Sequence, residues 1–200
     1  MIEFIQLKEV EDDLVEMAYE GGHFDAIVQG CNCFQVMGAG IAPQINKRFG
    51  GYPLKEDKAT KGGDYNKLGT YSVAYMGNNG GKAPALEMYG GGKDPIDWHP
   101  IGKAMFNLFV SHEDKSCLAI VNGYTQFDLG KDNFTGDIPV DYDAIRLVMR
   151  KINREFEGLR IGIPEIGCGL AGGEWDVVSK IIEEELTHVD ATIVHWKPRK

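Results

Sequence analysis

Short apolar runs alternate along the chain with segments whose hydrophobic residues recur at helical spacing. The runs are short enough to be buried strands and are predicted at 25–29, 69–76, 118–122, 159–164 and 191–196, with a first strand at 2–7. The clearest amphipathic helices are predicted at 142–156 and 175–186, and shorter ones at 11–19, 41–49 and 101–109. Strands that alternate with helices indicate one α/β sandwich around a largely parallel sheet, spanning residues 1–200.

Three segments carry weaker patterns. Residues 52–68 are polar and are expected to form a loop or a short helix. Residues 77–100 are rich in Gly, Asn, Lys and Pro, which favours a loop or a hairpin, and 123–141 are expected to be a polar loop. No linker, internal repeat or second domain is predicted.

Charge and hydropathy narrow the classes of partner. The net charge of −9 is spread along the chain, which argues against a nucleic-acid groove and against an anionic membrane surface. No apolar run approaches the roughly 20 residues that span a bilayer, and the start of the chain does not have the pattern of a signal peptide. We therefore expect a cytoplasmic monomer that binds a small molecule.

The four cysteines agree with a reducing compartment. Cys31 and Cys33 are too close in sequence for an easy disulfide, and Cys117 and Cys168 fall in expected core or loop positions. One C-x-C pair and five scattered histidines lack the paired spacing of a zinc site. Neither a metal nor a cofactor is expected.

Two glycine-rich segments, 30–42 and 162–173, carry the candidate chemistry. Each follows a predicted buried strand and leads into a predicted helix. A strand, a glycine loop and a helix bring backbone N–H groups close to phosphate. Two such units in one domain suggest a ligand with more than one phosphate that is held from two sides.

Three common classes of protein with such phosphate-binding loops are excluded by specific residues. The segment Gly167-x-Gly169-x-x-Gly172 matches the dinucleotide fingerprint, but the following strand ends at Trp196 without the acidic residue that holds the ribose. No loop ends in Gly-Lys-Ser/Thr, which excludes a P-loop. A cysteine phosphatase built on Cys168 needs an arginine six residues later, and Glu174 stands there.

The two segments together resemble the ligand loops of the macrodomains. Residues 27–33 and 37–42 are similar to the first loop, and 164–175, which ends in Trp175, is similar to the second. Within the macrodomains, the chain most resembles the branch that contains ADP-ribose-1″-phosphate phosphatases. This similarity lies in the Gly-Cys-Asn-Cys sequence, in Trp175 and in residues 122–126. The resemblance implies a three-layer α/β/α sandwich with a mixed, largely parallel sheet.

The resemblance further implies that ADP-ribose lies with its pyrophosphate between the loops. Asn32 matches the asparagine that contacts the distal ribose, although a turn-forming asparagine is the alternative. Backbone N–H groups would donate to phosphate without a positive charge. The implied ligand-binding residues are Gly30, Cys31, Asn32, Gly38, Ala39, Gly40, Ile41, Ala42, Tyr124, Gln126, Pro164, Ile166, Gly167, Cys168, Gly169, Leu170, Ala171 and Gly172.

The adenine end is less specified. Macrodomains often place an acidic residue there, for which Asp12 and Asp13 are near in sequence but poorly spaced from Asn32. The aromatic rings that remain as candidates for stacking on adenine are His195, Trp196 and Phe127.

Catalysis departs from the family pattern. Gln29 stands where relatives of this branch often have a histidine, and Ala171 stands where ADP-ribosyl ester hydrolases carry an aspartate. Candidate catalytic residues are Asn32, Gln29, Glu174 and His112. Hydrolysis of ADP-ribose-1″-phosphate is one hypothesis. A non-catalytic ADP-ribose reader, an ADP-ribosyl hydrolase and a scaffold for another nucleotide or a protein are the others.

Overall fold

The computed structural model describes residues 7–77, 117–130 and 137–199. Within these ranges a six-stranded sheet has the order β1-β6-β5-β2-β4-β3, and only β3 runs antiparallel to its neighbour. The predicted mixed, largely parallel sheet is confirmed. The strands are β1 (Lys8–Asp12), β2 (Ala26–Asn32), β3 (Tyr71–Gly77), β4 (Cys117–Gln126), β5 (Arg160–Ile163) and β6 (Asp190–Trp196).

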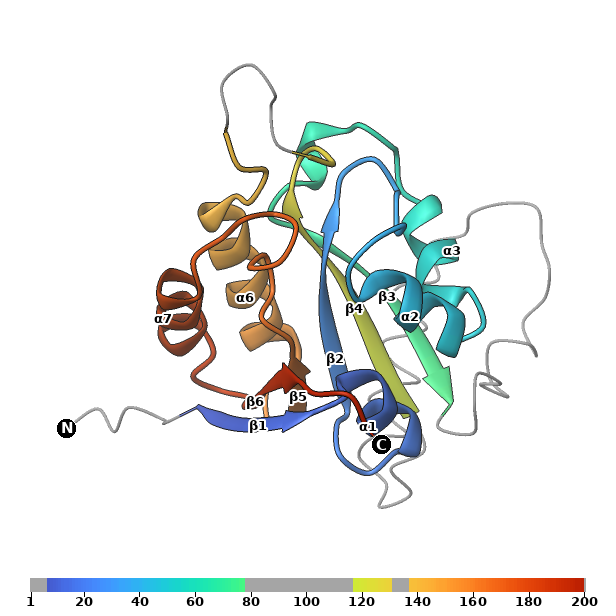
Figure 1. Cartoon of the computed structure of the whole chain (residues 1–200), viewed down its shortest axis with the longest axis vertical. Helices are drawn as coiled ribbons and strands as arrows, with labels where there is room; N and C mark the ends of the chain where they lie inside the picture. Colours follow the sequence, from blue (N-terminus) through green and yellow to red (C-terminus); the bar gives the residue numbers. More distant parts are fainter. Residues whose placement is uncertain (1–6, 78–116, 131–136, 200) are drawn as a thin grey trace.

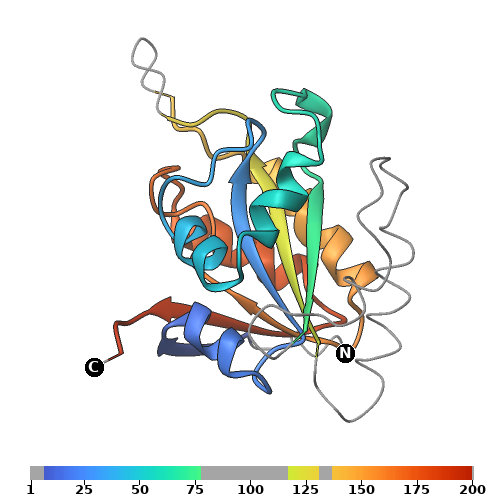
Figure 2. The same ribbon diagram turned by 90° about the vertical axis from the view of Figure 1, so that its right-hand side faces the viewer.

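Helices cover both faces of the sheet, which gives the expected three-layer α/β/α sandwich (Figures 1 and 2). One face carries α1 (Leu14–Glu20), α2 (Ala42–Arg48) and α3 (Tyr52–Lys58). The opposite face carries α6 (Tyr142–Glu155) and α7 (Trp175–Glu185), and a 3-10 turn spans Tyr65–Lys67.

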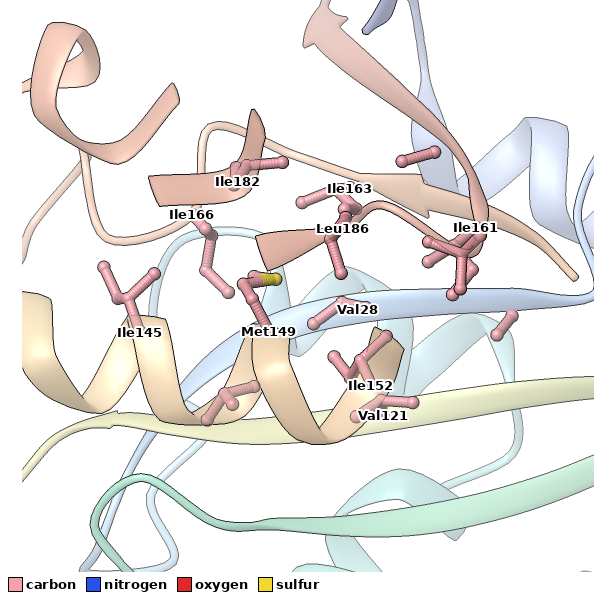
Figure 3. Packing of buried hydrophobic residues seen from close by; sticks show 14 of the residues in the cluster. Val28, Val121, Ile145, Met149, Ile152, Ile161, Ile163, Ile166, Ile182 and Leu186 are labelled. Atoms are coloured by element: carbon pink, nitrogen blue, oxygen red, sulfur yellow. The ribbon is translucent and has the colours of Figure 1, made fainter. Parts of the chain in front are cut away.

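Side chains that alternate along the central strands build two separate cores. Ala26 and Val28 of β2 face α6 and α7, whereas Ile27 between them faces α1 and α2. The larger cluster joins Val28 and Val121 to Met149 and Ile152 of α6 (Figure 3). Burial on both faces explains why β2 and β4 read as continuous apolar runs.

Local signals fix the helix ends. The carboxylate of Asp141 accepts a hydrogen bond from the Ala144 N–H at 2.8 Å and starts α6, and Asp13 caps α1 in the same way. Gly50 and Gly51 adopt φ values of +64° and +82° between α2 and α3. Most residues avoid these angles, which explains the Gly-Gly pair at this sharp connection.

Several predicted boundaries are wrong. The strand β1 lies at Lys8–Asp12, so the helix predicted from residue 11 begins instead at Leu14. The strand β4 continues through residues 123–126, which were predicted to be loop, and β2 continues through Gly30, Cys31 and Asn32. Nearly all of the strand predicted at 2–7, the helix at 101–109 and the segment 77–100 lie outside the described residues.

Candidate ligand-binding edge

The two glycine segments meet at the carboxyl ends of neighbouring strands. Loop 1 (residues 33–41) follows β2, and loop 2 (residues 164–174) follows β5, which pairs with β2 in parallel. A Cβ atom on Gly30 would lie 3.1 Å from Ile166 Cγ1, so loop 2 packs directly on the end of β2. Ligands of open α/β sheets bind at this edge, where the crossovers leave a crevice.

The backbone of both loops depends on glycine. Gly40 in loop 1 and Gly167 in loop 2 have φ values of +64° and +76°. A Cβ atom on Gly173 would lie 2.8 Å from the carbonyl oxygen of Gly167, so this close approach within loop 2 also requires glycine. The loops therefore have backbone shapes that few other sequences would adopt.

Both loops present N–H groups that have no acceptor among the described residues. In loop 1 these groups include those of Ala39 and Gly40, and in loop 2 those of Gly169 and Leu170. All four residues are exposed. Backbone N–H groups on two loops at the ends of neighbouring strands are suitable donors for an anion, even in a protein of net charge −9.

The predicted ligand-binding residues divide by depth. Those that reach the surface are Gly38, Ala39, Gly40, Gly169 and Leu170. The half-buried ones are Gly30, Ile41, Gln126, Pro164, Gly167, Cys168 and Gly172. The buried ones are Cys31, Asn32, Ala42, Tyr124, Ile166 and Ala171. The structure thus brings both sets of loop residues to one edge, with the first group outermost.

Asn32 holds loop 1 in shape. Its Oδ1 atom accepts hydrogen bonds from the N–H groups of Phe34 at 2.9 Å and Val36 at 3.3 Å, and its Nδ2 atom donates to the Val36 carbonyl at 2.7 Å. The turn-forming role considered from the sequence is therefore present. The contact from Nδ2 uses one of the two hydrogens that an amide nitrogen carries.

Gln29 and Tyr124 lie inside the fold. Gln29 is fully buried, and its amide donates to Asn122 Oδ1 at 2.7 Å, so this catalytic candidate lies in the core and not on either loop. Tyr124 is 1% exposed, and its hydroxyl donates to Asp57 at 2.9 Å beneath loop 1. Burial raises the pKa of Tyr124, so its hydroxyl stays protonated.

A buried ion pair under loop 1 was not predicted. The Nζ atom of Lys67 lies 3.2 Å from Asp57 Oδ1 and 4.1 Å from the centre of the Tyr124 ring. The side chains of Lys67 and Asp57 are only 7% and 1% exposed. Both residues belong to a polar stretch, which gave no sign that these charges would be covered.

The reactive groups on loop 2 are few. Burial, and then the charge of Glu165, raise the pKa of Cys168 to about 11, so its thiol is protonated near neutral pH. Glu174 is exposed and makes no side-chain hydrogen bond or ion pair within the described residues, whereas Glu165 lies against His195. The candidate His112 lies outside the described residues.

The candidates for the adenine end lie in two places, at the ends of β1 and β6, where Asp12 is the register partner of Trp196, and beyond β4. Trp196 is 66% exposed at the end of β6. Asp12 pairs with Arg199, and Asp13 caps α1. Phe127 lies beyond β4, where its ring contacts those of Phe34 and Tyr65 with centroid distances of 5.2 and 5.0 Å.

One curated protein is similar to the whole chain. It is an uncharacterised 17.5 kDa protein from the tk–vs intergenic region of Enterobacteria phage T4, 30% identical over 196 residues, which cover 96% of this chain and 97% of the phage protein. The chain belongs to the family of this phage protein. No protein-family model matches the sequence.

Solved structures relate the fold to the macrodomains. A protein of unknown function from Bacteroides thetaiotaomicron has a TM-score of 0.61 at 20% identity and covers 96% of this chain and 98% of its own. The macrodomain of Mycobacterium tuberculosis DarG has a TM-score of 0.55 at 18% identity, and the match covers 97% of this chain and 99% of the DarG macrodomain. Thermosipho africanus DarTG in complex with ADP-ribose has a TM-score of 0.55 at 16% identity and covers 98% of this chain but 43% of its own. The protein has the macrodomain fold.

Residues 7–77, 117–130 and 137–199 form neither a metal-binding cluster nor a membrane-spanning helix. No three His, Cys, Asp or Glu side chains there gather as a metal ion requires. No helix in those ranges is long and apolar enough to cross a bilayer. A cavity beside α6 is lined by Arg150 and Arg154, but these pair with Glu185 and Glu155, and none of its lining residues belongs to loop 1 or loop 2.

Proposed function

We propose that this protein binds ADP-ribose at the carboxyl edge of β2 and β5, with the pyrophosphate between loops 1 and 2. The observation that carries the proposal is a set of exposed N–H groups that have no acceptor among the described residues, contributed by both loops and oriented by glycine-dependent backbone. Such groups bind an anion through dipoles and not through net charge. The ADP-ribose complex of Thermosipho africanus DarTG, which shares the fold, supports the choice of ligand.

The variant Asn32→Ala tests whether the distal ribose of ADP-ribose lies at loop 1. We expect Asn32→Ala to weaken ADP-ribose binding by about two- to tenfold more than ADP binding, the range that one neutral hydrogen bond supplies. ADP lacks the distal ribose, so it reports the effect of the lost loop-1 turn alone. Calorimetric titration of both ligands measures the difference. Equal losses for ADP and ADP-ribose would place the distal ribose elsewhere.

Hydrolysis of ADP-ribose-1″-phosphate is the second function we propose. Glu174 favours it, because this exposed carboxylate at the end of loop 2 makes no side-chain hydrogen bond or ion pair among the described residues. Cys168 is protonated, so a water molecule and not the thiol is the nucleophile in this proposal. The loops would position the phosphate, and Glu174 would accept a proton from the water as it attacks phosphorus. The bond from phosphorus to the ribose oxygen would break, which releases inorganic phosphate and ADP-ribose.

Glu174→Gln separates the hydrolase from a reader of ADP-ribose. We expect the variant to lower the rate of phosphate release from ADP-ribose-1″-phosphate by about 10²-fold or more, because a positioned general base supplies that much. ADP-ribose affinity should stay within about twofold, since the amide keeps the size of the side chain. If the unaltered protein releases no phosphate but binds ADP-ribose, the reader function stands.

A further inference from the structure

His195 lies between two carboxylates that come from different parts of the chain. Its Nε2 atom is 3.1 Å from Glu9 Oε2 on β1, and its Nδ1 atom is 3.3 Å from Glu165 Oε1 in loop 2. The ring meets that of Trp175, the first residue of α7, edge-on with a centroid distance of 5.8 Å. The imidazole therefore connects loop 2 to the two strands at the edge of the sheet.

Only the protonated ring can donate a hydrogen bond to both carboxylates at once. A neutral imidazole has one N–H donor, whereas the imidazolium has two, one for each oxygen. Partial burial lowers the pKa of His195, but the hydrogen bonds to Glu9 and Glu165, and their charges, raise it more, so the pKa lies above its ordinary value. Within the described ranges, Glu11 is the register partner of His195 in the β-ladder, and its charge pairs with that of Lys197.

Glu165 extends this contact into loop 2. It precedes Ile166, which packs on β2, and Gly167, whose φ of +76° sets the turn of loop 2. A free carboxylate here would repel a pyrophosphate held by the same loop. We propose that the His195 imidazolium is a positioning residue: it holds Glu165 away from the anion and thereby makes anion binding at loop 2 dependent on pH. The inference rests on the proposed function.

The direction of the dependence follows from the protonated state. Below a pH of about 6.5, the ordinary pKa of histidine, the imidazolium is fully formed and both contacts are present. As the pH rises through the higher pKa of the folded protein, the imidazole keeps one N–H. The contact to Glu9, at 3.1 Å, is shorter than the contact to Glu165, at 3.3 Å, so the remaining N–H favours Glu9 and Glu165 is released. Affinity for the anion is therefore high at low pH and falls as the pH rises.

The free protein provides the first test. In NMR titration we expect the His195 ring to titrate above pH 6.5, and the amide resonances of Gly167 and Gly169 to shift with the same midpoint. Glu165→Gln should lower that midpoint and remove the response of the loop. His188→Gln is the matched control, because His188 contacts Asn153 and Thr187 and no carboxylate. The proposal would be overturned if the amide resonances of loop 2 did not shift with the titration midpoint of His195.

Ligand affinity provides the second test. We expect the dissociation constant for ADP-ribose to rise about two- to fivefold between pH 5.5 and 8.5, the range that partly exposed ion pairs supply. His195→Gln and Glu165→Gln should show no such rise, and His188→Gln should keep it. A rise that persists in His195→Gln contradicts the inference. Absence of ADP-ribose binding at every pH contradicts the proposed function instead, and the NMR titration then decides on His195 alone.

Discussion

Replacing Lys67 with methionine is expected to lower the free energy of unfolding by about 3–5 kcal/mol. The substitution leaves the Asp57 carboxylate buried without its cation, and Asp57 Oδ2 already has no hydrogen-bond partner. The charge of Lys67 also lies over the face of the Tyr124 ring, an attraction that methionine cannot replace. Urea unfolding followed by circular dichroism measures the loss.

Two comparisons identify its cause. Lys8→Met removes a cation of the same kind from an exposed pair with Asp190 and should change stability little. Adding Asp57→Leu to Lys67→Met removes the uncompensated charge and should recover much of the loss, as replacement of buried ion pairs by apolar residues often does. If the double variant is no more stable than Lys67→Met, lost packing and not the buried charge is responsible.

The sequence predicts best the elements that bury a full apolar stripe or run. The helix predicted at 142–156 is α6 at Tyr142–Glu155, and the one at 175–186 is α7 at Trp175–Glu185. The strand β1 was misplaced because its side chains are mostly exposed and charged. It exists through backbone pairing with β6, which leaves no hydrophobic pattern. The end of β4 was missed because Gly123 resembles a turn, whereas the neighbours β2 and β3 prolong the strand.

The candidate edge follows the same rule. Glycine spacing located both loops, because close backbone approach leaves a direct mark on the sequence. The partners of side chains left no such mark. Asp57 and Lys67 meet beneath loop 1, and Glu9 and Glu165 meet at His195, only because distant segments come together in the fold. The burial of individual side chains was also not predictable from the sequence. Strand pairing places Gln29 beside Asn122, and their side chains form a buried hydrogen bond.

Gly169→Val is expected to weaken ADP-ribose binding by at least about tenfold while the fold stays intact. A Cβ atom at Gly169 meets nothing within 4 Å, and this glycine is not among those with positive φ, so the protein itself accommodates a side chain. In the proposed complex that open space holds the pyrophosphate. Loss of one charge-assisted hydrogen bond from the loop costs about 1.5–3 kcal/mol, which corresponds to a factor of roughly 10 to 150.

Gly173→Ala separates this effect from damage to the loop. Its Cβ atom would meet the Gly167 carbonyl oxygen at 2.8 Å, so this smaller substitution should lower both the melting temperature and the affinity. Gly169→Val should lower the affinity alone, with stability within about 0.5 kcal/mol of the unaltered protein. Calorimetry and thermal unfolding of both variants give the four values required. Undiminished ADP-ribose binding by Gly169→Val would show that the pyrophosphate does not lie against loop 2, because no anion can approach that backbone past a valine side chain.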